Sequence, residues 1–312
     1  MTLALLALAL AAAQAPLPPS APSDAPAASP SSAAATASPG PEGLDWSRIP
    51  ASVGADALNP AQRGVLAQVL ERSFCYCGCP HTLLGCLTSH PACEHAPRMG
   101  ALAARLAGLG LAPGDVEKAL VDYYASFDQV KRANLDVTFF GPPLGDPAAP
   151  ITLVVFSDFQ CPFCQQFRPR LEALVERHKG RVKLFAKPFP LVTHPRALAA
   201  AEAAEWARSQ GIFWEFHDAM FANPKELDDD ALAALATRLG KDGDDLRKAL
   251  QEQRFRPRVQ EAQSEARRAG LVGTPTLYVN GRRHVIPDFS DTILDYTLDD
   301  EEEWARARGW RD

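Results

Sequence analysis

The sequence has little of two features that would define its partners: long hydrophobic runs and positive charge. Beyond the first 15 residues, no segment offers the about 20 consecutive apolar residues that a membrane-spanning helix needs. The 312 residues carry a formal net charge of −6 and no basic block, which argues against nucleic acid or an anionic membrane surface as a partner. The length allows one large domain or two smaller ones.

The first residues, MTLALLALALAAAQA, form an apolar run that ends in Ala13-Gln14-Ala15, an A-x-A-like cleavage signal. The run is too short to span a bilayer comfortably and has no Lys or Arg before its apolar part. We therefore expect residues 1–15 to be a cleaved secretory signal peptide; an Ala-rich leader and an uncleaved anchor are the alternatives. Export, to the periplasm or elsewhere outside the cytosol, would let disulfides persist.

Residues 16–56 are predicted to be a linker. Their first part, residues 16–43, is rich in Pro, Ala and Ser and has almost no large apolar residue. Such a segment buries too little apolar surface to fold and is typical of an extended tether.

A small helical domain is predicted over residues 57–140. Asn59 can cap a helix whose first residue is Pro60. Two further helical patterns follow a cysteine-rich stretch, and the Pro- and Gly-rich segment 141–150 ends the domain.

The remaining residues, 141–312, predict an α/β domain. ITLVVFSDF and RVKLFAKPF are typical of buried strands, and Asn280-Gly281 predicts a hairpin turn between two short strands. A helical insertion is expected at about 194–269, and a last helix is expected near the end of the chain.

Cys161-Pro162-Phe163-Cys164 lies between the first of these strands and a predicted helix. The free N–H groups and the dipole of a helix N-terminus stabilise a thiolate. We expect Cys161 to be an exposed nucleophile and Cys164 to be a more buried thiol that resolves the mixed disulfide. A metal clip and a static disulfide are the alternatives, although so short a disulfide loop would constrain little of the unfolded chain.

Thr274-Pro275 precedes a predicted strand, where a cis peptide bond would turn the chain sharply. A proline there would leave neighbouring backbone free to pair with an extended peptide. An ordinary turn is the alternative, because the sequence does not define the isomer.

Four other polar residues stand near the predicted strands and helices. Asp158 and Lys187 could tune proton transfer near Cys164, or could simply reach solvent from strand ends. His194 and His217 are interpreted as structural.

Four segments between residues 142 and 281 stand out: PPLGDPAAPITLVVFSDFQCPFCQQF, FPLVTHPRALAAAEAAEWA, FWEFHDAMF and GTPTLYVNG. In this order they resemble the DsbA-like branch of the thioredoxin superfamily. The resemblance implies a thioredoxin fold with an inserted helical domain, protein thiol or disulfide substrates, an unidentified redox partner and no cofactor for the exchange itself. It also assigns the roles of nucleophile, resolving thiol, cis-proline and helix-kink proline to Cys161, Cys164, Pro275 and Pro169.

One position departs from this family's pattern. Strongly oxidising members often carry a histidine between the two cysteines, where this chain has Phe163, as in glutaredoxin-like centres. We therefore expect a less extreme thiolate pKa, and the choice among oxidase, reductase and isomerase stays open.

Five of the 7 cysteines lie upstream, in CYCGCPHTLLGCLTSHPACEH. Their thiolates suit zinc or cuprous copper, but their spacing is not that of a standard zinc ribbon or finger. Two disulfides plus one free thiol, or a redox relay, are equally compatible. The candidate residues are Cys75, Cys77, Cys79, Cys86 and Cys93, with His81, His90 and His95 among them.

The helices around these cysteines weakly resemble the CcmH-type bundle of cytochrome c maturation, over residues 60–132. That resemblance would imply electron transfer to an apocytochrome or to the Cys161–Cys164 pair. The sequence thus favours an exported thiol–disulfide oxidoreductase, with a metal-binding protein or a redox-inert scaffold as competing hypotheses.

Overall fold

The structure, a computed structural model, describes residues 44–128, 132–286 and 288–307. All of them belong to one compact unit, residues 37–312. The predicted signal peptide and residues 16–43 of the predicted linker lie outside the described residues.

The cysteine-rich segment lies within a group of helices. The first of them begins as predicted, because the Asn59 side chain accepts the Gln62 N–H and the Gln62 side chain accepts the Asn59 N–H, each at 3.0 Å. A short helix between the predicted first and second helices was missed; Thr82 caps it by accepting the Gly85 N–H at 3.2 Å. The helices are α1 (Pro60–Arg72), α2 (Leu83–Ser89), α3 (His95–Gly108) and α4 (Pro113–Ala125).

The end of the predicted linker differs from an extended tether. Residues 44–57 contain the 3₁₀ turns η1 (Trp46–Arg48), η2 (Ala51–Val53) and η3 (Ala55–Ala57). Ile49 and Val53 in this segment are buried in the same hydrophobic cluster as α1 and α3. These apolar side chains hold residues 44–57 on the helices, whereas the extended tether was predicted from the composition of residues 16–43.

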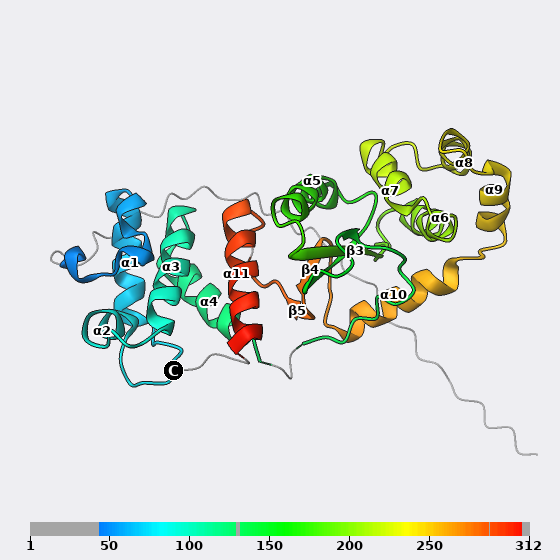
Figure 1. The fold of residues 1–312 in the computed structure, drawn as a ribbon. Coiled ribbons are helices and arrows are strands. Elements are labelled where there is room, and N and C mark those ends of the chain that lie inside the picture. The colour runs from blue at the N-terminus through cyan, green and yellow to red at the C-terminus, as the bar shows by residue number, and fades with distance from the viewer. Residues whose placement is uncertain (1–43, 129–131, 287, 308–312) are drawn as a thin grey trace, which may run out of the picture. The chain divides into compact units, whose positions relative to one another are not determined.

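A five-stranded mixed sheet forms the second part (Figure 1). Its order is β1-β3-β2-β4-β5, with β2 and β3 parallel and every other pair antiparallel. Asn280 (φ 48°) and Gly281 (φ 79°) form the predicted hairpin turn. A Cβ atom at Gly281 would lie 2.4 Å from the Ala133 carbonyl oxygen, so no larger residue fits. The strands are β1 (Leu144–Gly145), β2 (Ile151–Ser157), β3 (Val182–Pro188), β4 (Thr276–Val279) and β5 (Arg282–Arg283).

Alternating side chains of β2 enter two different cores. Leu153 and Val155 pack with the helices that follow β2 and β3, whereas Val154 and Phe156 pack with Leu271 on the other face. The predicted α/β fold with a helical insertion is confirmed. The helices are α5 (Pro162–Arg177), which contains Pro169, and the inserted α6 (Ala197–Ser209), α7 (Phe213–Ala222), α8 (Asp229–Arg238), α9 (Gly243–Gln251) and α10 (Arg256–Arg268).

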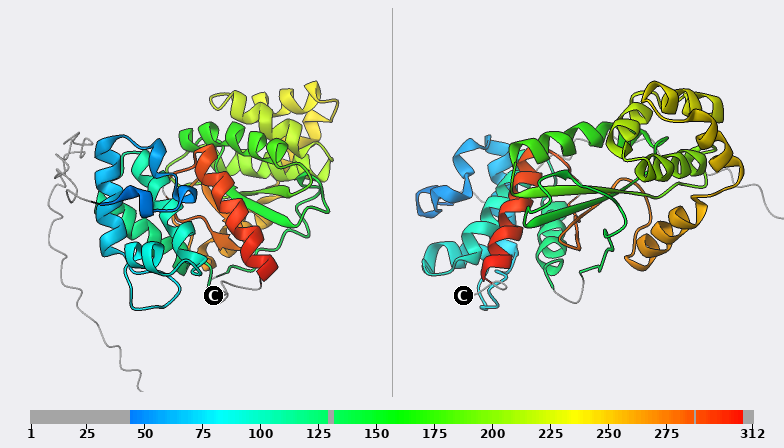
Figure 2. Two further views of the ribbon diagram at one scale, coloured as in Figure 1. Left: turned by 60° about the vertical axis from the view of Figure 1, so that its left-hand side comes forward. Right: turned by 45° about the vertical axis from the view of Figure 1, so that its right-hand side comes forward.

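The last helix, α11 (Asp291–Ala307), contacts α3, α5 and β2 (Figure 2). Leu294 and Leu298 join the core of the sheet, whereas Ile293, Tyr296 and Trp304 join the core of α1 to α4. The predicted boundary at residue 140 therefore does not separate the two hydrophobic clusters. None of the helices in the described ranges is long and apolar enough to cross a membrane.

Candidate active site

Cys161 caps the N-terminus of α5. Its backbone is extended (φ −76°, ψ 119°), and Pro162 follows as the first helical residue. The Cys161 N–H donates to the Asp158 carbonyl at 3.1 Å, and the Cys161 carbonyl accepts the Gln165 N–H at 3.1 Å. The sulfur therefore lies at the end of the helix where N–H groups have no intrahelical acceptor.

Both thiols of the pair are buried, because Cys161 is 4% exposed and Cys164 is 3% exposed. The expectation of an exposed Cys161 is therefore wrong. The segment before β4 covers the sulfur, which contacts the Thr274 carbonyl oxygen at 3.5 Å.

The two thiols differ strongly in acidity. The hydrogen bond from the Cys164 thiol is the largest influence on Cys161 and lowers its pKa to about 5, against the opposing effect of burial. The same hydrogen bond, together with burial, raises the pKa of Cys164 far above its usual range. A pKa of about 5 lies between those of DsbA, about 3.5, and thioredoxin, about 7. Cys161 is therefore ionised at neutral pH, while Cys164 holds a proton.

The Thr274–Pro275 peptide bond is cis, as the resemblance implies. The buried Thr274 hydroxyl finds no hydrogen-bond partner among the described residues, and Thr274 lowers the pKa of Cys161. Its hydroxyl can thus donate to the thiolate, which favours the charged form.

Asp158 joins the loop before Cys161 to the loop after β3. Its Oδ1 accepts the Gln160 N–H at 2.7 Å. Its Oδ2 accepts the Leu191 N–H at 2.8 Å and lies 2.9 Å from His194 Nδ1. Because Asp158 is only 2% exposed, the alternative that it reaches solvent is wrong.

Lys187 is also buried, so it does not reach solvent either. Its ammonium group forms an ion pair with Glu265 and donates to the Asp136 carbonyl at 2.6 Å. Burial lowers the pKa of Lys187. Its partners lie in α10 and in the segment before β1, not at the cysteine pair.

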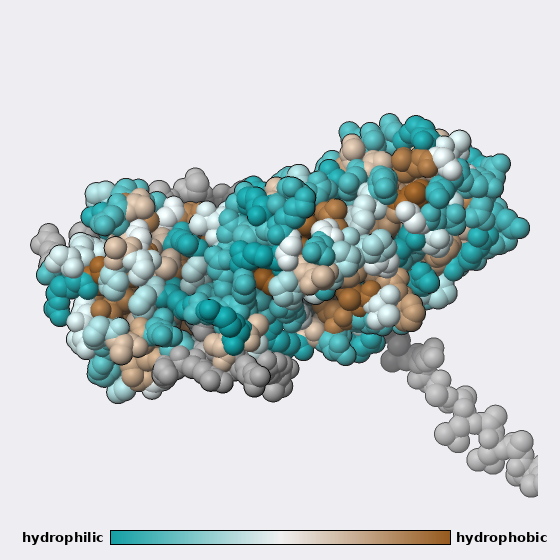
Figure 3. All heavy atoms as spheres, in the orientation of Figure 1, coloured by the Kyte–Doolittle hydropathy of each residue, from teal (hydrophilic) through white to brown (hydrophobic). Residues whose placement is uncertain are grey.

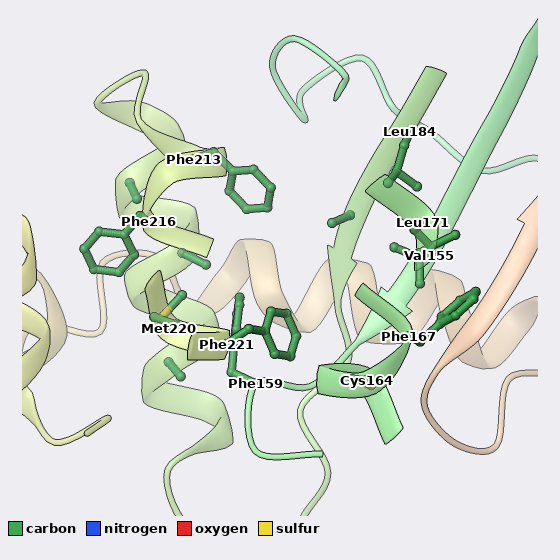
Figure 4. Close-up of a cluster of buried hydrophobic side chains, with 14 of the residues drawn as sticks. Val155, Phe159, Cys164, Phe167, Leu171, Leu184, Phe213, Phe216, Met220 and Phe221 are labelled. Carbon is green, nitrogen blue, oxygen red and sulfur yellow. The ribbon is translucent and has the colours of Figure 1, made fainter. Parts of the chain in front are cut away.

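Sequence reasoning missed the surroundings of Cys164. This thiol, Pro275, Glu172 and His217 line a cavity of about 20 Å³, enough for one water molecule. His217 is buried, with Nδ1 2.9 Å from Asp218 Oδ1. The His-Asp pair in FWEFHDAMF was the available signal, but only the packing of α7 brings His217 to the cavity that Cys164 also lines. Figure 4 shows Cys164 on α5 in the core formed with β2, β3 and α7.

Three exposed apolar side chains belong to the segments that contact the loop at Cys161. Phe163 follows it and is 67% exposed, and Val272, two residues before Thr274, is 87% exposed. Val192, in the loop that Asp158 holds, is 98% exposed. Figure 3 shows hydrophobic patches near α5, α7 and α10, next to a largely hydrophilic surface over α11.

The upstream cysteines converge as well. All of them are free thiols, and Cys75 and Cys86 are buried. The sulfur atoms of Cys75 and Cys93 are 3.6 Å apart, and that of Cys79 lies 2.9 Å from Cys86 and 3.1 Å from Cys77. Burial raises the pKa of Cys86 to about 12.

Comparisons with known proteins agree with this geometry. A family model described as thioredoxin matches residues 141–298, half of the chain. A probable disulfide bond formation protein D of Bacillus cereus is 31% identical over 159 residues, which cover 47% of this chain and 72% of that protein. The chain belongs to the thioredoxin family, and the predicted DsbA-like thioredoxin fold is confirmed.

Three other proteins match about half of this chain, but the match covers very different shares of their own lengths. The Na⁺/H⁺ antiporter NhaA 3 of Salinispora tropica is 40% identical over 141 residues, 45% of this chain, but the match spans only 22% of the antiporter. Oxidised BdbD from Bacillus subtilis aligns with a TM-score of 0.49 and 24% identity over 55% of this chain and 97% of that one. DsbA from Xylella fastidiosa aligns with a TM-score of 0.43 and 29% identity over 52% of this chain and 92% of that one.

Proposed function

We propose that this chain is an exported protein-disulfide oxidoreductase that exchanges disulfides with extended protein substrates at Cys161 and Cys164. The observation that carries the proposal is the pairing of a Cys161 thiol with a pKa of about 5 and a protonated Cys164 that donates to it. Cys161 is ionised and can attack a disulfide at neutral pH, whereas Cys164 stays protonated beside it until the resolving step.

In the reducing direction, the Cys161 thiolate attacks one sulfur of a substrate disulfide. A bond from Cys161 to that sulfur forms, the substrate S–S bond breaks, and a substrate thiolate leaves. Cys164 then loses its proton and attacks Cys161, which releases the second substrate thiolate. Two electrons have moved to the substrate, and the chain holds a Cys161–Cys164 disulfide. The reverse sequence oxidises a substrate dithiol.

Loss of the Cys164 proton is the least favourable step of this reaction, because burial destabilises the Cys164 thiolate. Once Cys161 is in the mixed disulfide, its negative charge no longer faces Cys164. The pKa of Cys164 then falls, which allows the resolving attack.

The exposed side chains of Phe163, Val192 and Val272 supply apolar contacts for a substrate segment around the buried sulfur. The backbone before β4, at Thr274 and Pro275, supplies an edge along which an extended peptide can align. Unfolded or partly folded proteins offer such segments, whereas compact ones do not.

Export rests on the apolar N-terminal run with its A-x-A-like site and on the redox chemistry, which needs an oxidising compartment to form lasting disulfides. Cell fractionation with an antibody to the chain tests it, together with the mass of the mature N-terminal peptide. Recovery of uncleaved chain only with the cytosol would contradict export.

The exchange itself is tested with insulin reduction and with refolding of a reduced, disulfide-containing protein. Cys161→Ser should abolish both activities, whereas Cys164→Ser should accumulate a mixed disulfide that is visible on non-reducing gels and released by dithiothreitol. Full activity of Cys161→Ser would remove this residue as the nucleophile. If neither variant differs from the wild type, the pair is inert.

A further inference from the structure

The upstream cysteines hold a second group of sulfur atoms that the disulfide exchange does not use. The Sγ atoms of Cys75, Cys77, Cys86 and Cys93 all lie within 4.8 Å of one another. Zinc binds thiolates at about 2.3 Å in a tetrahedron, which places neighbouring sulfurs about 3.8 Å apart. The 3.6 Å between Cys75 and Cys93 matches that spacing. We propose that these four cysteines bind one zinc ion.

The mutual closeness of all four sulfurs favours a metal over two disulfides. A disulfide needs each sulfur to approach only one other, to about 2.0 Å. Here Cys86, wholly buried on α2, lies near the other three members of the group. A single central ion satisfies all of these approaches at once.

Cys79 is the cysteine left over. Its sulfur lies 2.9 Å from that of Cys86 and 3.1 Å from that of Cys77, and it forms a second group of three with Cys86 and the exposed His81. That second group shares Cys86, so it cannot bind an ion at the same time as the four-thiol group. The group of four buried or half-buried thiols is the better zinc site of the two, because zinc in structural sites takes four protein ligands and leaves no position open.

The local backbone is shaped to present these sulfurs. Gly78 adopts φ 80°, and its N–H reaches the Cys75 carbonyl at 3.4 Å, which closes a tight turn. The Cys75 N–H donates to the His81 carbonyl at 3.4 Å, so the chain doubles back before α2. The Cys93 N–H donates to the His90 carbonyl at 2.9 Å, and this turn brings the chain back to the site before α3 begins.

The ion and the backbone N–H groups together offset the negative charge of the thiolates. Four thiols that bind Zn²⁺ release four protons and leave a net charge of −2. The N–H of Cys77 points to the sulfur of Cys75, and the N–H of Cys79 points to that of Cys77. These amides face the thiolates as donors.

A zinc ion here would stabilise the fold of residues 73–95. α2 has only seven residues, too few to persist without tertiary support. The ion would tie α2 to the turn at Gly78 and to the start of α3. The role is therefore structural, and it is independent of the exchange proposed for Cys161.

The test is the zinc content of the full chain, purified anaerobically under reducing conditions. We expect one zinc ion per chain, and about a tenfold or greater loss in Cys77→Ser and in Cys93→Ser. Cys79→Ser and Cys164→Ser are the matched controls and should keep the ion. Cys77 and Cys93 are half-buried, so their replacement disturbs the core less than replacement of Cys86 would.

Cobalt provides a second readout that does not depend on zinc retention. The chain loaded with Co²⁺ should show the intense red-region absorption of a tetrahedral thiolate site, present in Cys79→Ser and absent in Cys77→Ser. Circular dichroism of each variant checks that its helices are formed.

Three results would overturn the proposal. One is a helical wild-type chain that takes up neither zinc nor cobalt. Another is an intact mass that shows the loss of the hydrogens of two disulfides in the cluster after purification without oxidant. The third is metal binding that depends on Cys79 and His81 but not on Cys93. Insulin reduction measured on the same samples keeps the outcome for Cys161 separate.

Discussion

Replacing Cys164 with alanine tests why Cys161 is so acidic. The hydrogen bond from the Cys164 thiol is the largest influence that lowers the pKa of Cys161 to about 5. A hydrogen bond to a charged group contributes about 1.5–3 kcal/mol, and one pKa unit corresponds to about 1.4 kcal/mol. Cys164→Ala should therefore raise the pKa of Cys161 by about 1–2 units.

The assay is the rate of iodoacetamide alkylation at Cys161 as a function of pH, read by peptide mass spectrometry so that the upstream thiols do not interfere. Cys164→Ser is the matched control, because a hydroxyl can still donate to the thiolate and should leave a smaller rise. Thr274 and the backbone N–H groups of α5 remain in both variants, so the pKa should stay below that of a free cysteine.

Two outcomes would refute this reasoning. A wild-type pKa near that of free cysteine, about 8.5, would show that the helix terminus and its donors do not stabilise the anion. A Cys164→Ala variant with an unchanged, low pKa would show that the stabilisation comes from elsewhere at the N-terminus of α5.

Three further predictions concern stability and substrate turnover. Because folding lowers the pKa of Cys161, its thiolate contributes to the stability of the reduced chain fully above pH 9, and this contribution is lost as the pH falls towards 5. The difference in Tm between the wild type and Cys161→Ala should therefore shrink over that range. A difference that stays constant would contradict this prediction. Pro275→Thr should slow substrate release and increase the mixed disulfide in insulin reduction, whereas an unchanged rate would remove Pro275 from the site. Asp158→Asn should lower the free energy of unfolding in urea by about 1–3 kcal/mol, because it weakens the buried bonds to the loop after β3, whereas Glu176→Gln on the exposed surface of α5 should change little.

Local sequence was enough for the features whose cause is local. Asn59 and Pro60 define the start of α1, because capping depends on residues within one turn. Asn280-Gly281 defines the hairpin, because few residues tolerate positive φ. The position of Cys161 at a helix N-terminus followed in the same way from a strand, a Pro162 and a helical pattern.

Contacts between distant segments could not be predicted in this way. The exposed or buried state of Cys161 depends on the segment at Thr274, more than a hundred residues away in the sequence. The bond of Asp158 to His194 and the presence of His217 in the cavity that Cys164 lines also depend on how loops and α7 pack on the sheet.

The sequence by itself determined the family, the α/β order of elements, the cysteine pair and the presence of an unusual upstream cluster. Only the tertiary structure decided that α11 joins both hydrophobic cores, and that the upstream thiols converge, with the sulfurs of Cys75, Cys77, Cys86 and Cys93 all within 4.8 Å of one another. The physical reason is that spacing along a chain defines which residues share a turn, whereas burial and convergence depend on packing between surfaces that no local pattern encodes.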